Sequence, residues 1–270
     1  MSNNAAAFVG SIPQHYDEGL GPIIFADYAD DIARRIAALN PARVLETACG
    51  TGIVTRRLRD RLPAAAHLTA TDLNPPMLDI ARAKFNAGEQ VAFQPADAMA
   101  LPFADGSFDT VVCQFGVMFF PDKDKAYREV LRVLAPGGHY VFSVWDTHRH
   151  NAFARIGHEL LGRLFPADPP QFMTVPFSYG FEPIKESLVE AGFADITVAV
   201  IRLEKTVPDV AAFARGQVYG SPIIDQVRAR GGVEPEAVVA ALVRDFHRAF
   251  GADPARMTLQ ALVVSATKPA

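Results

Sequence analysis

Between about residue 42 and residue 146, the spacing of the hydrophobic residues alternates between a strand-like and a helix-like pattern. Short runs rich in β-branched residues are each followed by a stretch whose apolar positions lie three and four residues apart. The runs predict strands over 42–46, 67–72, 91–95, 108–114 and 139–145, with helices over 53–62, from Asn74 to about Phe85, and over 122–134. Strands that alternate with helices are typical of βαβ units, so the pattern predicts a parallel, doubly wound sheet.

The pattern changes after residue 146. Residues 147–181 combine prolines with many aromatic side chains and show no clean period, which predicts an inserted lid. Beyond them we predict a helix over 182–191, a strand over 195–205, a second helical insertion over 207–252 and a last strand over 257–267. The two terminal strands have no full crossover between them. The predicted fold class is therefore α/β and Rossmann-like: a mostly parallel seven-stranded sheet with an antiparallel final strand, plus helical cap insertions.

Composition narrows the functional classes. The formal net charge is −4, and no basic stripe is present, so no nucleic-acid partner is expected. No apolar run approaches the roughly 20 residues of a membrane-spanning helix. The N-terminus lacks a signal peptide's basic and apolar regions, and two cysteines make no disulfide framework. We expect a soluble cytoplasmic protein without a membrane span.

The strongest local signal is a glycine-containing loop between the first predicted strand and its helix. Gly50 and Gly52 allow a tight turn and a close approach of the backbone to a ligand. Asp72 follows Gly52 by 20 residues, the spacing at which a carboxylate meets ribose hydroxyls. Thr55 stands where a dinucleotide fingerprint needs a small residue, and Glu46 would repel a pyrophosphate. An adenosine joined to a cationic amino acid fits this loop better than a dinucleotide.

Five motifs in this order resemble the class I S-adenosylmethionine (SAM)-dependent methyltransferases, in particular the ubiquinone/menaquinone-biosynthesis branch. They are Glu46-x-Ala-Cys-Gly-Thr-Gly52, Thr71-Asp72-Leu73-Asn74-x-x-Met77, Asp97-Ala98-x-x-Leu101-Pro102-Phe103, residues 108–115 and the stretch from Glu129 to Gly138. The resemblance covers about residues 42–146. Ala48 departs from the family's pattern, which often has glycine there.

The resemblance implies roles for particular residues. Asp72 would bind both ribose hydroxyls, Leu73 and Met77 would pack on adenine, and Asp97 with the Ala98 N–H would bind the adenine edge. The main chain at Gln114 and Phe115 would meet the SAM amino group, and Tyr16 would close over the cofactor. The full predicted cofactor set is Tyr16, Glu46, Ala48, Gly50, Thr51, Gly52, Asp72, Leu73, Met77, Asp97, Ala98, Gln114 and Phe115.

With the resemblance, the chain divides into four predicted segments. Residues 1–41 form an N-terminal helical segment that closes over the cofactor, and 42–146 form the SAM-binding core. Residues 147–181 form the lid, and 182–270 complete the sheet around the insertion 207–252. The predicted partner is a small-molecule methyl acceptor, apolar or aromatic, with S-adenosylhomocysteine (SAH) as the product; a homodimer is possible.

The sequence does not identify the catalytic group. His148 and His150 are weak candidates for a general base, and a solvated loop is the alternative. No further ligands at zinc-like spacing accompany them, so no metal site is predicted. Phe177 and Tyr179 are weak candidates for substrate contacts. Two rival functions remain: a SAM- or SAH-binding subunit that has lost catalysis, and a nicotinamide oxidoreductase on the same fold.

Overall fold

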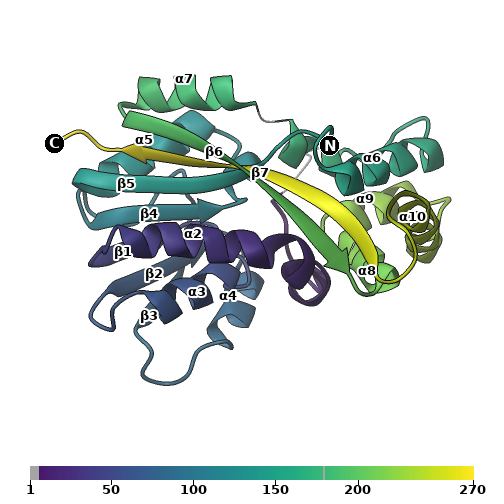
Figure 1. Cartoon of the computed structure of the whole chain (residues 1–270), viewed down its shortest axis with the longest axis horizontal. Coiled ribbons are helices and arrows are strands. Elements are labelled where there is room, and N and C mark those ends of the chain that lie inside the picture. Colours follow the sequence, from purple (N-terminus) through teal and green to yellow (C-terminus); the bar gives the residue numbers. More distant parts are fainter. Residues whose placement is uncertain (1–5, 179) are drawn as a thin grey trace. The chain divides into compact units, whose positions relative to one another are not determined.

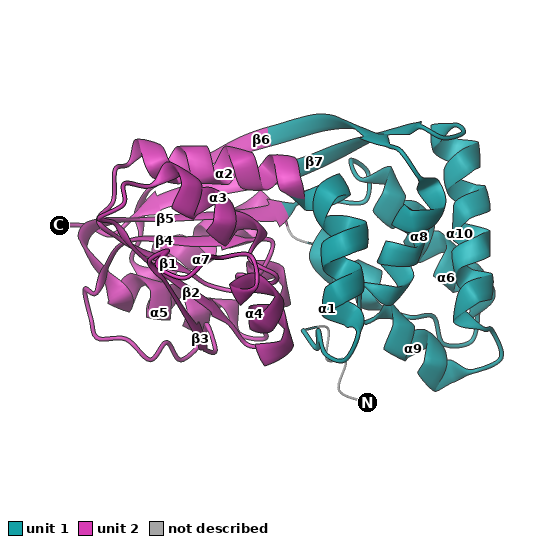
Figure 2. Ribbon diagram, turned by 90° about the horizontal axis from the view of Figure 1, so that it is seen from below, with its two compact units in different colours: residues 1–25, 145–179, 201–261 teal, residues 26–144, 180–200, 262–270 magenta. Residues whose placement is uncertain are grey.

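The computed structural model describes residues 6–178 and 180–270 and divides the chain into two compact units. Unit 1 comprises residues 1–25, 145–179 and 201–261, and unit 2 comprises residues 26–144, 180–200 and 262–270 (Figure 2). Both insertions predicted from the sequence fall mainly into unit 1, together with the N-terminal segment. The division into four segments stays a prediction.

A seven-stranded sheet runs through unit 2 in the order β3-β2-β1-β4-β5-β7-β6 (Figure 1). The strands are β1 (Arg43–Glu46), β2 (His67–Asp72), β3 (Val91–Pro95), β4 (Phe108–Gln114), β5 (Leu134–Trp145), β6 (Ala194–Val207) and β7 (Ala255–Thr267). The first five are parallel, with Leu45 of β1 between Thr69 of β2 and Val111 of β4. In Figure 1 the yellow strand β7 lies between β5 and β6.

The final strand runs against its neighbour. The Gly137 N–H donates to Lys268 O at 2.9 Å and the Lys268 N–H donates to Gly138 O at 2.8 Å, whereas the Asp146 N–H donates to Gln260 O. Residue numbers along β5 therefore rise as those along β7 fall, which is the antiparallel arrangement. The predicted fold class is confirmed.

Helices cover both faces of the sheet in unit 2. Helices α2 (Ala26–Ala38) and α3 (Ile53–Arg61) pack side by side on one face, and α5 (Lys123–Val133) packs with α7 (Phe181–Ala191) on the other (Figures 1 and 2). Consecutive residues Val111 and Val112 of β4 are both fully buried. A strand buried on both faces carries consecutive apolar residues, and the run 111–113 made this strand predictable as a central one. The remaining helix after β2 is α4 (Pro75–Arg82).

Unit 1 is mainly helical. Its helical elements are α1 (Ile12–His15), the π-helical segment η1 (Tyr16–Phe25), α6 (Ala152–Leu164), the 3₁₀ segment η3 (Phe172–Phe177), α8 (Val210–Tyr219), α9 (Ile223–Arg230) and α10 (Pro235–Phe250). The segments η1 and α8 meet backbone to backbone, because a Cβ atom on Gly19 would lie only 2.7 Å from Gly216 Cα. The segment η1 thus packs closely on α8 at Gly19 and Gly216, where there is no room for a side chain.

The predicted start of one strand was wrong. Strand β5 starts at Leu134 rather than residue 139, because Leu134 is already extended and pairs with Phe108 of β4. Within the predicted lid 147–181, which showed no clean period, residues 152–164 form the regular helix α6. All four prolines of the segment 147–181 lie beyond Phe165, so they do not interrupt this helix.

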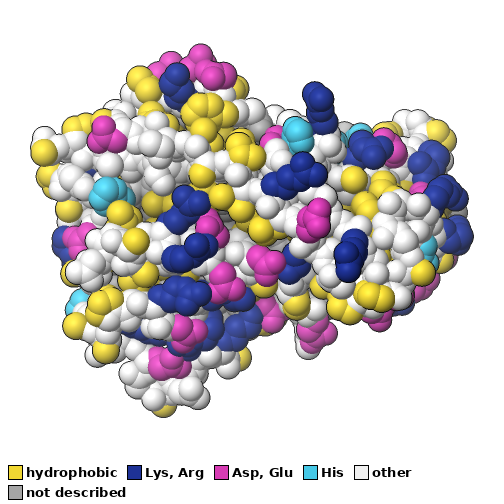
Figure 3. Space-filling view, viewed as in Figure 1, with side chains coloured by type: hydrophobic (Ala, Val, Ile, Leu, Met, Phe, Trp, Pro, Cys, Tyr) yellow, Lys and Arg dark blue, Asp and Glu magenta, His cyan; other side chains and the backbone are white. Residues whose placement is uncertain are grey.

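Among the described residues, no helix combines the length and the apolar character that crossing a bilayer requires. On the face shown in Figure 3, cationic side chains lie among anionic ones rather than in a single basic stripe. Arg57 and Arg61 of α3, for example, both contact Asp30 of α2. That no nucleic acid binds stays a prediction.

Candidate functional site

The loop from Thr47 to Gly52 joins β1 to α3 at the carboxyl ends of three strands. The Thr47 N–H donates to Val112 O in β4, and the Cys49 N–H donates to Thr71 O in β2, both at 2.9 Å. These bonds fix the loop between the two neighbours of β1. Ligands of open α/β sheets bind at this edge, where the strands end.

The two glycines of the loop are required for different reasons. Gly50 has φ of +56°, and a Cβ atom at this position would have no neighbouring atom within 4 Å. It therefore needs glycine for its backbone angle and leaves open space in front of it. Gly52 has φ of +79°, and a Cβ there would lie 2.9 Å from Ala81 Cβ of α4. The loop can thus turn tightly and leave its backbone accessible, as a bound ligand requires.

Asp72, the last residue of β2, holds the loop in place through hydrogen bonds of its carboxylate. Its Oδ2 accepts from the Gly50 N–H and its Oδ1 from the Asn74 N–H, both at 2.8 Å. Burial raises the pKa of this carboxyl, and the two N–H donors oppose that rise. The Ala96 N–H also donates to the Asp72 backbone oxygen, which places the end of β3 beside it. Asp72 thus stands where the loop, β2 and β3 converge.

Glu46, the last residue of β1, is a buried carboxylic acid. It is 1% exposed, and its Oε2 has no hydrogen-bond partner among the described residues. Burial raises the pKa of Glu46 to about 8, and the charge of Asp72 adds to that rise. The buried hydroxyl of Thr51 likewise has no partner in the described part of the chain. A bound ligand with a cationic amino group would satisfy this carboxylate, so the donor set fits SAM.

The predicted adenine residues lie on the segments that follow β2 and β3. Leu73 is 56% exposed, whereas Met77 and Ala98 are buried. Asp97 Oδ1 accepts from the Met99 N–H at 2.8 Å, which shapes the turn after β3. This bond is what an ordinary turn aspartate makes, so the adenine role of Asp97 stays a prediction.

The residues that follow β4 lie beside the loop between β1 and α3. Phe115 has φ of +54°, its N–H donates to Ser143 O at 3.0 Å, and its ring meets the edge of Tyr28 at 5.4 Å. The next residue, Gly116, was not singled out from the sequence. A Cβ on Gly116 would lie 2.5 Å from Ala48 Cβ and 2.8 Å from Cys113 Sγ. The sequence signal that could have indicated Gly116 is a glycine two residues after the end of the predicted strand 108–114.

We expect Gly116→Ala to lower the free energy of unfolding by about 2–3 kcal/mol, because the added methyl group overlaps Ala48. Ala48 has φ of +50°, a backbone angle that glycine adopts at no steric cost. In the double variant Ala48→Gly/Gly116→Ala, the overlap with Ala48 disappears and the loss should be smaller by at least about 1 kcal/mol. Denaturant melts of the four proteins measure this coupling; simple additivity would contradict the contact.

Several predicted residues belong to unit 1. The Tyr16 ring stacks on Phe25 at 4.9 Å, and His148 Nε2 lies 2.9 Å from Met173 O. Phe177 is buried, and His150 is exposed. Tyr179 lies outside the described residues. Their roles toward cofactor and acceptor stay predictions.

Cys49 lies within the loop but is not suited to nucleophilic chemistry. Burial raises the pKa of its thiol well above the usual value, and the nearby carboxyl groups of Glu46 and Asp72 raise it further. The thiolate, which is the nucleophile, is therefore disfavoured. Within residues 6–178 and 180–270, no group of three His, Cys, Asp or Glu residues is arranged to hold a metal ion.

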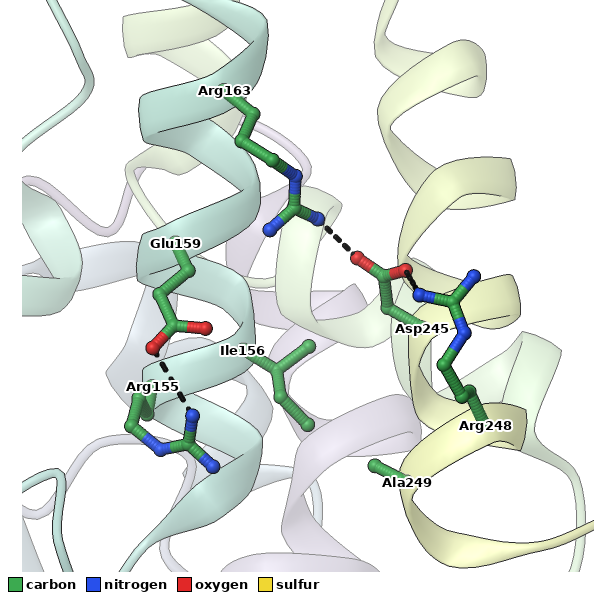
Figure 4. Close-up of a pocket in the computed structure, with 7 residues that line it drawn as sticks. All are labelled: Arg155, Ile156, Glu159, Arg163, Asp245, Arg248 and Ala249. Carbon is green, nitrogen blue, oxygen red and sulfur yellow. Dashed lines mark hydrogen bonds and ion pairs between the residues drawn. The ribbon is translucent and has the colours of Figure 1, made fainter.

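Unit 1 also has an open hollow of about 660 Å³ between α6 and α10 (Figure 4). Its lining is mostly charged, and the charges are paired with each other: Arg155 with Glu159, and both Arg163 and Arg248 with Asp245. Exposed ion pairs of this kind contribute little to stability. The three arginines exceed the two carboxylates by one positive charge.

Comparison with known proteins assigns the part of the chain that contains this cluster to a protein family. A sequence profile described as a methyltransferase domain matches residues 44–138, which include the loop, Asp72 and Asp97. The chain contains a class I SAM-dependent methyltransferase domain. The predicted family resemblance is confirmed, and with it SAM as the cofactor of the domain's family.

Curated relatives match over more residues than this profile does. The chain is 43% identical over 127 residues to a demethylmenaquinone methyltransferase of Thermus thermophilus, covering 47% of this chain and 57% of that protein. It is 32% identical over 169 residues to a ubiquinone/menaquinone biosynthesis C-methyltransferase of Pseudomonas paraeruginosa, covering 57% and 66%. The chain thus spans about half to two thirds of the length of these curated relatives.

A solved structure supports the fold over the whole chain. The phosphoethanolamine N-methyltransferase 2 of Haemonchus contortus, solved with phosphomonomethylethanolamine and SAH, superposes with a TM-score of 0.63. The superposition covers 100% of this chain and 61% of that one, at 17% sequence identity. At this identity the likeness concerns the fold alone.

Proposed function

We propose that this protein is a methyltransferase that moves the methyl group of SAM to a small aromatic acceptor of the quinol type. The observation that carries the proposal is the loop cluster. In it, a buried Glu46, whose Oε2 has no hydrogen-bond partner among the described residues, and an N–H-bound Asp72 flank the open backbone of Gly50. The quinol type is suggested by the demethylmenaquinone substrate in the name of the Thermus thermophilus relative.

The residues would divide the cofactor between them. SAM supplies a methyl group activated by a cationic sulfur. Glu46 would bind its ammonium group, and Asp72 would accept from its ribose hydroxyls. The side chains thereby hold the cofactor in one orientation, and orientation is most of what transfer to a nucleophilic acceptor requires.

We also propose that the acceptor is selected by the segments 147–181 and 207–252. Described parts of both lie in unit 1, where Phe153 contacts Phe177 and Phe213 at ring distances of 5.8 and 6.0 Å. Aromatic surfaces of this kind suit an apolar ring better than a phosphorylated acceptor. A cytoplasmic location, supported by two buried free cysteines, and a homodimer belong to the same proposal.

The test is methyl transfer from methyl-labelled SAM to reduced 1,4-naphthoquinone, with the label extracted into organic solvent. We expect label in the product with the wild-type protein and a large loss with Asp72→Ala. Transfer to none of a panel of naphthoquinols, phenols and amines, by a protein that binds SAH, would instead support the SAM-binding subunit without catalysis.

A further inference from the structure

Helices α6 and α8 of unit 1 face each other through two successive contacts. The first joins Phe153 and Phe213, whose ring centroids are 6.0 Å apart. The second lies one helical turn further on, where a Cβ on Gly157 would come within 3.4 Å of Gln217 Oε1. Because residues four apart share a helix face, the aromatic pair and the Gly157–Gln217 pair line one surface.

Gln217 is buried but unsatisfied. It is 4% exposed, and neither its Oε1 nor its Nε2 has a hydrogen-bond partner among the described residues. A buried amide that forms no hydrogen bond destabilises the folded protein, so an apolar residue of similar size would be more stable here. Buried polar groups of this kind call for an explanation, and a bound polar atom is one.

Gly157 lies beside both Gln217 and Met173, and the backbone oxygen of Met173 lies 2.9 Å from His148 Nε2. Gly157 contributes no side chain, and a Cβ atom on it would lie 3.6 Å from Met173 Cε. His148 contacts the rings of both His158 and Phe177, at 5.3 and 5.1 Å. The buried Nδ1 of His158 also has no partner in the described part of the chain. Methionine is an unbranched, adaptable side chain that can yield to a ligand.

We propose that the carboxamide of Gln217 binds the hydroxyl or carbonyl oxygen of the aromatic acceptor and thereby sets its specificity. The inference rests on the proposed function and adds the residue that distinguishes a hydroxylated ring from a plain one. The amide offers a donor and an acceptor, which match a phenolic hydroxyl in either direction. Phe153, Phe177 and Phe213 supply apolar surface for the ring.

The experiment compares the binding of 1-naphthol with that of 1-methylnaphthalene, in which a methyl group replaces the hydroxyl. Both are titrated, with and without SAH, into the wild-type protein, Gln217→Leu and Gln217→Met. The control is Gln14→Leu, the same change at an exposed glutamine of unit 1. We expect wild type and control to prefer 1-naphthol about tenfold, and both Gln217 variants to lose that preference.

SAH affinity and melting temperature are measured for the same variants. SAH affinity should stay within twofold in every variant, and the melting temperature of Gln217→Leu should rise by about 2–4 °C, since an unsatisfied amide is removed. A preference for the hydroxyl that persists in both Gln217 variants, or a wild type that shows none or binds neither probe, would overturn the assignment. Failure of the wild-type protein to bind SAH would count against the proposed function, whatever the naphthol result.

Discussion

Asp72→Ala is expected to weaken SAH binding by about 30- to 150-fold. Two hydrogen bonds from ribose hydroxyls to a carboxylate are worth roughly 2–3 kcal/mol together, because bonds to charged groups are the stronger kind. The carboxylate also accepts from the N–H groups of Gly50 and Asn74, so its loss loosens the loop as well. Isothermal titration with SAH measures the change.

The matched control is Asp79→Ala in α4. That carboxylate lies on an exposed part of the helix, where it contacts Arg82, and its removal should leave SAH affinity unchanged. Asp72→Asn retains one carbonyl acceptor but not the charge, and we expect it to fall between the two. A folded Asp72→Ala protein with wild-type SAH affinity would refute the ribose role.

Glu46→Gln is expected to change stability and binding in opposite directions. In the wild-type protein, burial raises the pKa of Glu46 to about 8, above the ordinary value of 4.5. The folded state therefore binds a proton that the unfolded chain has released, and stability from this group falls as pH rises from about 4.5 to about 8. Glutamine does not titrate, so the variant lacks this loss.

The difference in free energy of unfolding, variant minus wild type, should grow by on the order of 3–4 kcal/mol between pH 5 and pH 8. Denaturant melts at several pH values measure it, and a difference independent of pH would contradict the raised pKa. The pH scan also separates this effect from a general loss of packing, which would not follow the titration of one carboxyl.

Ligand binding gives the second half of the same test. If the cationic amino group binds the ionised form of Glu46, SAH affinity should rise with pH, approaching tenfold per unit below about 8. In Glu46→Gln, affinity should be lower at pH 8 and nearly flat with pH. Equal affinities of wild type and variant at pH 8 would place the amino group elsewhere.

Much of unit 2 could be predicted because its signals are local. The strand 108–114 contains the apolar run 111–113, and Pro75 follows Asn74 at the start of α4, so both elements appear where the sequence placed them. Gly50, Gly52 and Asp72 are close in sequence and carry distinct chemical signals. Glu46 was predicted to meet a cation from its place at the strand end. Its burial, with no hydrogen-bond partner for Oε2 among the described residues, fits that expectation.

The rest depends on contacts between distant segments. Helix α6 was missed because prolines and aromatic residues just beyond it masked its apolar face. Neither Gly116 nor Gln217 stands out in the sequence, since Gly116 is limited by Ala48, far along the chain, and Gln217 matters through its lack of partners among the described residues. Which strand β7 would pair with likewise required the folded sheet.

The central claim, that the loop cluster binds SAM rather than a dinucleotide, is tested most directly by thermal unfolding with SAH and with NAD. A ligand that binds only the folded protein adds RT ln(1 + [L]/Kd), about 2.7 kcal/mol at a hundredfold excess over Kd. We predict a clear rise in melting temperature with SAH, a smaller one with Asp72→Ala, and none with NAD. A shift with NAD and none with millimolar SAH would contradict the account.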